Sequence, residues 1–424
     1  MKKIISLFLA GMLVFGLVGC NSQEISETET EAGDDTMDNG KDEEVFPETL
    51  LINGVDVSEF RIVYSQNPMA DQYKKYSTLV TQDTEYDEQT AEYLAQRLKE
   101  CFGVELEVVK DTDVSATAHE INIGSTNRII DPYSMSCLVT DKDYAIKMMS
   151  TGCLFLRGKT YGATWHSVDG LIDYIMTKKE KTVDLPADFS LEDKADLLVV
   201  ACVGDSLTYG SKPSSYSDSI VSTSDRQKIV PYPMVLQRLE WKNMTVYNYG
   251  HGGRTAIEDF FVEGEGSRSY CDSPQYTALL ENVENIDLII MMLGTNDGNP
   301  TRTKATGYTV STGSFKKKYI SSCQNLVDAF KKKNGDVEIV MLNAPILFNS
   351  SWESNLESFI RKYQTETATQ LGLTIYDMYD YTKTNLTKSD FPDSVHPTDE
   401  GYTTFAVGID ALIQPTLEAM LKRQ

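Results

Sequence analysis

From residue 197 onward, the chain alternates between apolar runs of strand length and helical segments, and this alternation constrains its fold more than any other feature. The apolar runs predict strands at 197–204, 245–250, 287–294, 337–345 and 374–379. Near-continuous apolar runs are typical of parallel strands that are buried on both faces. Amphipathic segments separate them, so this half of the chain is predicted to be a three-layer α/β/α sandwich with a parallel sheet.

Polar and glycine-rich motifs follow the predicted strands at the point where each strand ends. Ser206 follows the first strand in "VVACVGDSLTYG", Gly253 follows the second in "NYGHGGRT", and Asn296 follows the third in "GTND". Asp393 and His396 lie in "DSVHP", after the fifth strand. Ligands of open α/β sheets bind at the carboxyl ends of the strands, so we expect these motifs to converge on one edge.

Together these residues supply every role of acyl transfer. A serine hydroxyl needs a base, and that base needs a carboxylate to orient it, which predicts Ser206 as nucleophile, His396 as base and Asp393 as its partner. The backbone N–H groups of Ser206 and Gly253 and the side chain of Asn296 are candidate oxyanion donors. Each motif alone is also compatible with a turn or a helix cap, and the prediction rests on the combination.

The chain from about Leu197 to Gln424 resembles the SGNH hydrolases, also called the GDSL esterase/lipase family. The motifs that carry the resemblance are "GDSLT", "NYGHGGRT", "GTND" and "DSVHPTDEGY". The resemblance implies a flavodoxin-like α/β/α sandwich and a serine esterase that uses the residues named above. It implies no metal and no organic cofactor.

The residues around these motifs supply candidates for the substrate pocket but do not determine which residues line it. Asp205, Tyr209 and His251 are candidate substrate contacts, and His251 stands where the family often has an aliphatic residue. Four tyrosines near the predicted rim are candidates for stacking on sugar rings: Tyr209, Tyr216, Tyr249 and Tyr308. Two polar segments, 211–227 and 298–314, are predicted to be loops, the second being either a lid or an ordinary surface insertion.

Residues 50–190 are predicted to form a smaller α+β domain. Within it, "INIGSTNR" and "LRGKTYGATWHSVDGLIDYI" resemble the N-terminal domains of some bacterial glycoside hydrolases, such as alpha-glucuronidases. The alternative is a spacer that holds the second domain away from a membrane. Trp165 and His166 lie on a predicted helix of this domain, where packing is the alternative to ligand contact. The polar, Pro-containing segment 177–196 predicts the boundary before the hydrolase domain at 197–424.

The N-terminus predicts export and a lipid anchor. Two lysines precede an apolar stretch over 4–18, which is short for a membrane span, so residues 1–19 read as a signal peptide. "LVGC" resembles the bacterial lipobox, which implies a lipid on Cys20 and a location on the outer face of the cell membrane. The alternative is an ordinary signal or anchor helix with a chance cysteine. The acidic run over 20–49 predicts a solvated tether.

Composition excludes some partners and metals. The formal net charge of −24 excludes binding that depends on neutralising nucleic-acid phosphates. The cysteines form no CxxC pair, and with four histidines no zinc-ligand spacing occurs. An exported chain is able to form disulfides, but the sequence leaves their pairing and the oligomeric state open.

We therefore predict a secreted, membrane-tethered serine esterase that removes O-acetyl groups from polysaccharide. The alternatives are a lipid or aryl esterase, a thioesterase, an enzyme acting on acetylated peptidoglycan, and a non-catalytic glycan-binding lipoprotein. Long apolar loops around the pocket would favour a lipid substrate, whereas the flanking segments are mostly polar. Loss of Ser206, Asp393 or His396 would have favoured a binding protein, and all three are present.

Overall fold

The computed structural model describes residues 47–65, 85–128, 135–211 and 231–423. The predicted signal peptide, Cys20 and nearly all of the acidic tether lie outside these residues, as does most of the predicted loop 211–227. Residues from Val45 to Gln424 belong to one compact unit. Within the described residues, no helix combines the length and the hydropathy needed to cross a membrane.

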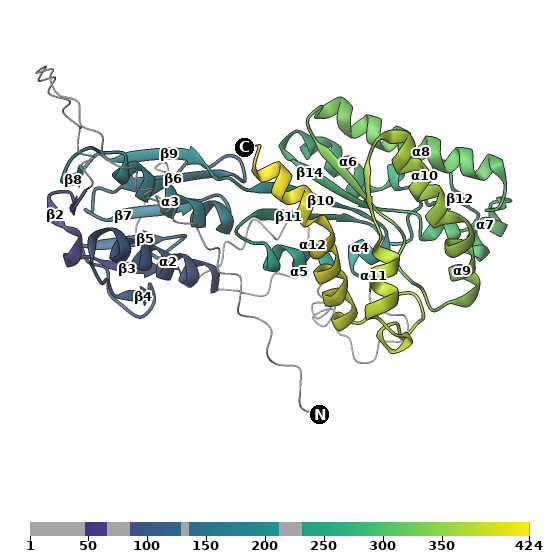
Figure 1. Cartoon of the computed structure of the whole chain (residues 1–424), viewed down its shortest axis with the longest axis horizontal. Helices are drawn as coiled ribbons and strands as arrows, with labels where there is room; N and C mark the ends of the chain where they lie inside the picture. The colour runs from purple at the N-terminus through teal and green to yellow at the C-terminus, as the bar shows by residue number, and fades with distance from the viewer. Residues whose placement is uncertain (1–46, 66–84, 129–134, 212–230, 424) are drawn as a thin grey trace, which may run out of the picture. The chain divides into compact units, whose positions relative to one another are not determined.

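A five-stranded parallel sheet forms the second half of the chain, as the apolar runs predicted (Figure 1). Its strands are β10 (Leu198–Gly204), β11 (Met244–Gly250), β14 (Leu288–Met292), β15 (Glu338–Leu342) and β16 (Thr374–Tyr376). Alternate residues of β10 join different apolar clusters: Val199 and Val203 pack on one face, and Val200 and Cys202 on the other. All seven residues of β10 are buried, which explains its near-continuous apolar sequence.

Helices cover both faces of this sheet and give the predicted three layers (Figure 1). One face packs against α6 (Pro274–Asn282), α8 (Gly313–Lys333) and α10 (Arg361–Leu371). The other packs against α5 (Tyr232–Leu239), α11 (Met378–Asn385) and α12 (Asp399–Leu421). Shorter elements at the strand ends are α4 (Ser206–Tyr209), β12 (Phe261–Val262), β13 (Gly266–Ser267), α7 (Pro300–Ala305) and α9 (Ser350–Asn355).

The order of the strands locates the binding edge. Across the sheet it is β11-β10-β14-β15-β16, so the first strand lies between the second and the third. This is the flavodoxin-like order, whose topological switch point lies between β10 and β14. Ser206 follows β10 and Asn296 follows β14, so both residues leave the sheet at this point.

The smaller N-terminal domain contains a six-stranded mixed sheet in the order β4-β3-β5-β7-β6-β9. Its strands are β3 (Arg61–Tyr64), β4 (Val108–Lys110), β5 (Glu120–Ile123), β6 (Asp143–Met148), β7 (Leu154–Gly158) and β9 (Ser190–Lys194). The helices α2 (Glu85–Phe102) and α3 (Tyr161–Met176) pack on it, with Ala91, Leu94 and Leu98 of α2 fully buried, as their spacing predicted.

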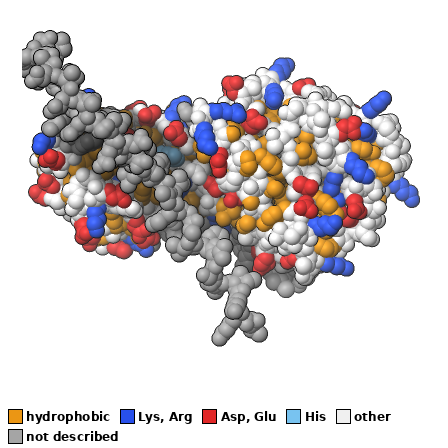
Figure 2. All heavy atoms as spheres, viewed as in Figure 1, with side chains coloured by type: hydrophobic (Ala, Val, Ile, Leu, Met, Phe, Trp, Pro, Cys, Tyr) orange, Lys and Arg blue, Asp and Glu red, His pale blue; other side chains and the backbone are white. Residues whose placement is uncertain are grey.

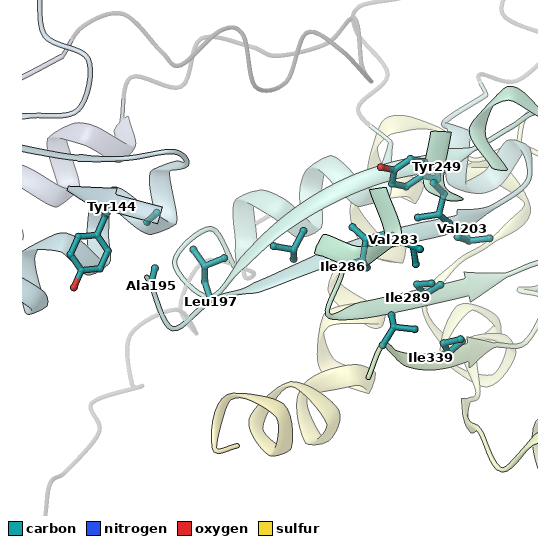
Figure 3. Packing of buried hydrophobic residues seen from close by; sticks show 14 of the residues in the cluster. Tyr144, Ala195, Leu197, Val203, Tyr249, Val283, Ile286, Ile289 and Ile339 are labelled. Carbon is teal, nitrogen blue, oxygen red and sulfur yellow. The ribbon is translucent and has the colours of Figure 1, made fainter. Parts of the chain in front are cut away.

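The polar segment 177–196, in which the sequence placed the domain boundary, contains two strands. β8 (Thr182–Leu185) pairs with β1 (Thr49–Ile52), which also pairs with β2 (Val55–Asp56). β9 pairs with β6 at the edge of the six-stranded sheet, and its residues are mostly exposed, so its sequence is polar. Buried Ala195 and Leu197 then lead into β10 as part of one apolar cluster (Figure 3).

Trp165 and His166 of α3 pack rather than offering a binding surface. The Trp165 ring stacks on Tyr93 with centroids 4.1 Å apart and meets Trp241 edge-on at 5.4 Å. His166 Nε2 lies 3.1 Å from the Lys242 carbonyl oxygen, and burial lowers the pKa of this imidazole. Both side chains therefore serve the packing alternative that the sequence left open.

The segment 298–314 is also more ordered than predicted, because it is not a single flexible loop. Asn299 caps α7 by accepting the N–H groups of Thr301 and Arg302, and Thr312 caps α8 through the N–H of Phe315. Helix α7 is short and carries few apolar residues, so hydrophobic periodicity did not reveal it.

On the face drawn in Figure 2, acidic and basic side chains are interspersed between apolar ones.

Candidate active site

Ser206 is the first residue of α4, directly beyond the carboxyl end of β10. Asp205 caps this short helix, since its Oδ1 accepts the N–H of Leu207 at 2.9 Å. Gly204 allows the helix to pass close to the strand end, because a Cβ there would lie 2.0 Å from Thr208 Oγ1. The turn leaves the Ser206 side chain 9% exposed at the edge of the sheet.

Asp393 and His396 come from one short loop that leads into α12. Asp393 Oδ1 accepts the backbone N–H groups of Val395 at 2.9 Å and of His396 at 2.7 Å. These bonds fold the loop around the carboxylate, as in an Asx turn. The three-residue spacing thus places both side chains on the same side of the loop.

The backbone between them is fixed from outside as well. Ser394 has a φ of 68°, in the left-handed region that side chains other than glycine rarely adopt. Its carbonyl oxygen accepts the N–H groups of Phe348 at 3.0 Å and Asn349 at 3.1 Å, both from the segment after β15. The loop is therefore anchored to a neighbouring strand end.

The three side chains form one hydrogen-bonded chain. Ser206 Oγ lies 3.0 Å from His396 Nε2, and His396 Nδ1 lies 2.8 Å from Asp393 Oδ2. An ionised carboxylate only accepts hydrogen bonds, so the proton of a neutral His396 is assigned to Nδ1. Nε2 is then left with a lone pair to accept the Ser206 hydroxyl proton, which is the arrangement that activates a serine.

Two of the three candidate oxyanion donors lie on the backbone. Gly253 has a φ of 73°, which favours glycine and turns the loop after β11. Among the residues that the structure describes, none accepts a hydrogen bond from the N–H of Ser206 or of Gly253. Both N–H groups are thus free of partners within that part of the chain.

The third candidate, Asn296, is held by several partners. Its Nδ2 lies 3.2 Å from Asp205 Oδ2 and 3.0 Å from the Arg254 carbonyl oxygen, and its Oδ1 accepts Nη1 of Arg302 at 2.7 Å. These bonds fix the orientation of the amide. A substrate oxygen bound at Asn296 Nδ2 would therefore share an N–H group with Asp205 or with the Arg254 carbonyl oxygen.

Asp297, the last residue of "GTND", ties the second and third motifs together. Its two carboxylate oxygens accept the N–H groups of Ala256 at 2.9 Å and Ile257 at 3.0 Å, just beyond Gly253. Burial raises the pKa of Asp297 to about 7, against the opposing effect of these two hydrogen bonds. The carboxylate therefore anchors the loop that presents Gly253.

The candidate substrate contacts occupy different environments. Asp205 is completely buried, so its side chain is not placed to touch a substrate, and this prediction is wrong; burial raises its pKa to about 6. Tyr209 is 53% exposed and is accessible. His251 is half-buried, with Nδ1 2.5 Å from Gln275 Oε1 and Nε2 3.1 Å from Nη2 of Arg254. Burial lowers the pKa of His251, which favours its neutral form.

The other tyrosines proposed to stack on sugars are less available. Tyr249 is 2% exposed, which excludes it from a surface platform. Tyr308 packs against Phe260 and Phe315, with ring centroids 5.6 and 5.8 Å away. Tyr216 lies outside the described residues. Of the four, Tyr209 is the one that the described structure leaves open.

Sequence reasoning missed two arginines, Arg268 and Arg302, which reach the loop of Gly253. No motif marks them, and Arg302 lay in a segment predicted as a loop. In the described ranges, no group of three or more His, Cys, Asp and Glu side chains is placed to hold a metal ion. The six cysteines of these ranges are unpaired: Cys101, Cys137, Cys153, Cys202, Cys271 and Cys323.

Comparison with known families identifies the domain. Residues 202–404 match the GDSL-like Lipase/Acylhydrolase family, so this part of the chain is an ester hydrolase domain. These residues form an SGNH, or GDSL, hydrolase domain, and the resemblance predicted from its motifs is confirmed for this domain. None of the curated protein sequences compared with the chain matches it.

Solved structures with a similar fold include three bacterial esterases. A carbohydrate acetylesterase family member from Sinorhizobium meliloti is 20% identical, with a TM-score of 0.35 over 53% of this chain and 100% of that one. A family two carbohydrate esterase from Clostridium thermocellum is 16% identical, with a TM-score of 0.38 over 55% and 69%. An acetyl xylan esterase from Geobacillus stearothermophilus is 16% identical, with a TM-score of 0.35 over 52% and 97%. Values of this size leave the substrate unassigned.

Proposed function

We propose that this ester hydrolase is an exported, lipid-anchored serine esterase that removes O-acetyl groups from polysaccharide. The observation that carries the catalytic part is the hydrogen-bonded chain from Ser206 through His396 to Asp393, with contacts of 3.0 and 2.8 Å. It joins residues that lie 190 positions apart in the sequence. Such a chain is the arrangement that a serine nucleophile requires.

In the first step, Ser206 Oγ attacks the ester carbonyl carbon while His396 Nε2 takes the hydroxyl proton. Asp393 keeps the imidazole in the required tautomer and stabilises the imidazolium that forms. The carbonyl oxygen becomes an oxyanion, which the N–H groups of Ser206 and Gly253 and the Asn296 amide would hold. Removing one such donor typically costs about 10²–10³ in rate.

The intermediate then collapses. The carbon–oxygen bond to the leaving alcohol breaks, and His396 returns its proton to that alcohol, which leaves an acyl group on Ser206. Water next attacks the acyl-enzyme, with His396 as its base, and releases the carboxylic acid and free serine. No step requires a metal or a cofactor.

The location and the substrate class rest on sequence features. The lipobox-like "LVGC" and the acidic run after Cys20 support a protein tethered outside the cell. The resemblance of residues 50–190 to accessory domains of glycoside hydrolases supports a polysaccharide substrate. Exposed Tyr209, three residues after the serine, offers a ring on which a sugar would stack.

The test is acetate release by the full-length protein, its Ser206→Ala variant and a matched Ser321→Ala variant. Ser321 is exposed on α8, and its hydroxyl donates only to the Lys318 carbonyl. Acetylated xylan, acetylated peptidoglycan and p-nitrophenyl esters of short and long acyl chains are compared in parallel. We expect the rate to fall by at least about 10⁴ in Ser206→Ala and to stay unchanged in Ser321→Ala.

The substrates separate the alternatives. Release of acetate from a glycan by the parent, lost in Ser206→Ala, supports the deacetylase and identifies the glycan. Cleavage of long-chain esters alone would replace it with a lipid esterase. Equal rates in the parent and Ser206→Ala would overturn the serine mechanism.

A further inference from the structure

Three arginines from separate segments meet beside Gly253. Arg254 follows β11, Arg268 follows β13 and Arg302 lies on α7. A Cβ built on Gly253 would lie 3.3 Å from Nη2 of Arg302 and 3.4 Å from Nη1 of Arg268. Two guanidinium groups thus approach one point, next to the glycine whose amide is a candidate oxyanion donor.

Both guanidinium groups keep unused hydrogen-bond donors at this point. Glu265 Oε2 forms an ion pair with Nη2 of Arg268 at 2.7 Å and accepts a hydrogen bond from Nε of Arg302 at 3.2 Å. Nη1 of Arg302 donates to Asn296 Oδ1 at 2.7 Å and approaches the Gly253 carbonyl oxygen at 3.4 Å. Within the described ranges, no acceptor pairs with Nη1 of Arg268 or Nη2 of Arg302, the two nitrogens beside Gly253.

Three arginines gather here although the chain carries a net charge of −24, and the carboxylates that act on them are Glu265, Asp272 and the buried Asp205. One carboxylate, Glu265, is shared by two arginines. Arg254 adds a third positive charge, and its Nη1 donates to the carbonyl oxygens of Ser267 and Ser269 on either side of Arg268. Burial and the nearby Arg268 charge both lower the pKa of Arg254, so the cations repel one another.

We propose that Arg268 and Arg302 form an anion-binding subsite beside the oxyanion donors, and that it selects esters carrying a carboxylate close to the ester group. The inference rests on the proposed esterase function and names its substrate class as O-acylated acidic glycans, such as those that contain uronic acids. Guanidinium groups suit a carboxylate because they offer planar, paired donors. A carboxylate at this point would also relieve the repulsion between the arginines.

The position of the subsite links recognition to chemistry. Arg302 donates a hydrogen bond to Asn296, a candidate oxyanion donor. An anion held by Arg302 would therefore lie close to the candidate oxyanion site. In the part of the chain that the structure describes, Arg268 does not contact Asn296, and its side chain is 22% exposed, so a change at Arg268 tests the subsite without disturbing Asn296. A neutral substrate would leave the unused donors to water and would gain nothing from them.

The experiment compares two matched substrates with the full-length protein. One is the fully O-acetylated methyl glucuronoside, and the other is its uncharged glucuronamide. We expect kcat/KM for the acid to exceed that for the amide by about tenfold, the size of one charge-assisted hydrogen bond, and this ratio to fall as salt is added. In Arg268→Met the ratio is expected to drop below about threefold, and Arg268→Lys is expected to be intermediate because it keeps the charge.

A second measurement does not depend on a variant folding. Methyl glucuronoside without acetyl groups should inhibit hydrolysis of p-nitrophenyl acetate more strongly than methyl glucoside does. p-Nitrophenyl hemisuccinate, compared with the acetate, tests whether the anion belongs on the acyl side instead. Lys331→Met, which removes an exposed charge at the end of α8, is the matched control and should keep the parent ratio.

The outcomes separate this inference from the proposed function. The subsite would be overturned, and the esterase would stand, if three results occurred together. The acid and the amide would be hydrolysed at equal rates, p-nitrophenyl hemisuccinate would not be preferred over the acetate, and methyl glucuronoside and methyl glucoside would inhibit equally. Equal loss for both substrates in Arg302→Met, with Arg268→Met unchanged, would assign Arg302 only to positioning Asn296. If the parent cleaves no ester at all, the esterase itself fails.

Discussion

Two groups of ionisable side chains, one in each sheet region, show different uses of the same chemistry. In the N-terminal sheet, the fully buried carboxylate of Glu120 lies 2.7 Å from Nε of Arg128 and is also paired with Arg61, and it accepts the N–H of Thr117. Burial alone would raise its pKa, but the hydrogen bonds from Arg128 and Arg61 hold that pKa below its usual value. The Glu120 carboxylate is thus fully paired with partners inside the protein.

The group around His396 is open at one end. Its carboxylate partner, Asp393, is 8% exposed and the imidazole is 23% exposed, and the chain of bonds ends at the hydroxyl of Ser206, the proposed nucleophile. The comparison teaches that pairing between charges does not mark a site. An active site is indicated by a hydrogen-bonded group of charges that ends at a nucleophile accessible to a substrate. The following predictions test this distinction, from the largest expected effect to the smallest.

The largest effect is expected from Asp393→Asn. The substitution keeps the size of the side chain but removes the acceptor that assigns the proton to His396 Nδ1, so kcat should fall by about 10⁴. The free energy of unfolding should change little, because an amide oxygen is still able to accept the loop N–H groups. Steady-state kinetics and urea unfolding measure the two quantities. Asp380→Asn, at an exposed position on α11, is the control, and a comparable loss there would refute the assigned role.

Glu120→Gln should lower the unfolding free energy and leave kcat unchanged, which is the opposite of the result expected for Asp393→Asn. Losing the shared carboxylate leaves two arginines without their counter-charge, which costs about 3–5 kcal/mol of unfolding free energy. Activity per folded molecule should be unchanged, as shown by kcat at a temperature where the variant is folded. Glu105→Gln removes an exposed partner of Lys99 and should have no measurable effect. A fall in kcat with stability intact would show that the Glu120 group is not merely structural.

Asp297→Asn probes a carboxylate that supports the open group. An amide has one acceptor oxygen where Asp297 uses two, so unfolding free energy should fall by about 1–3 kcal/mol and kcat should fall with the loop of Gly253. Because the folded pKa is raised to about 7, the native state binds more protons than the unfolded state between pH 4 and 7. Parent stability therefore declines as pH rises through that window, by at most about 1.4 kcal/mol per pH unit for this group.

Urea unfolding at several pH values between 4 and 8 measures this effect. The difference in stability between the parent and Asp297→Asn should be largest near pH 4 and should shrink as pH rises. A difference that stays constant with pH would mean that the pKa of Asp297 is not raised in the folded protein.

The smallest effect is expected from relieving positive φ angles in the two regions. Ser394, at 68°, should be stabilised by up to about 1 kcal/mol on substitution by glycine, since serine tolerates this region poorly. Asn53, at 53° in the turn between β1 and β2, should change by less, because asparagine is common there. Thermal unfolding of Ser394→Gly and Asn53→Gly compares them. Equal shifts would mean that the loop of His396 carries no more backbone strain than an ordinary turn.

Much of the second domain could be predicted because its order comes from local pattern. The strands β10 to β16 are short apolar runs, and Ser206, Gly253 and Asn296 come shortly after β10, β11 and β14. Val199 and Val200 enter different faces of the sheet, which requires the continuous apolar sequence that reveals the strand. Ser206 was found because it follows a buried strand, whereas Asp393 and His396, which lie beyond β16 and α11, were found through their Asp-x-x-His motif.

The rest depends on contacts that no local pattern records. β9 is polar because it lies at a sheet edge, so its sequence looks like a connection. Asp205 was predicted as a substrate contact from its place beside Ser206, yet it is completely buried as the N-cap of α4. Arg268 and Arg302 lie 3 and 37 positions after Glu265 and both pair with it, and only the folded structure shows that they also reach Gly253.

The strand order has a consequence for how the molecule comes into being. The strand that carries Ser206 precedes the other four strands of its sheet along the chain, and His396 follows all five. Closing so long a loop is slow and comes late in folding, because the entropy of the intervening chain opposes it. A nascent or truncated chain would therefore contain its nucleophile without its base. Hydrolytic capacity would arise only after all five strands and the loop of His396 have been synthesised.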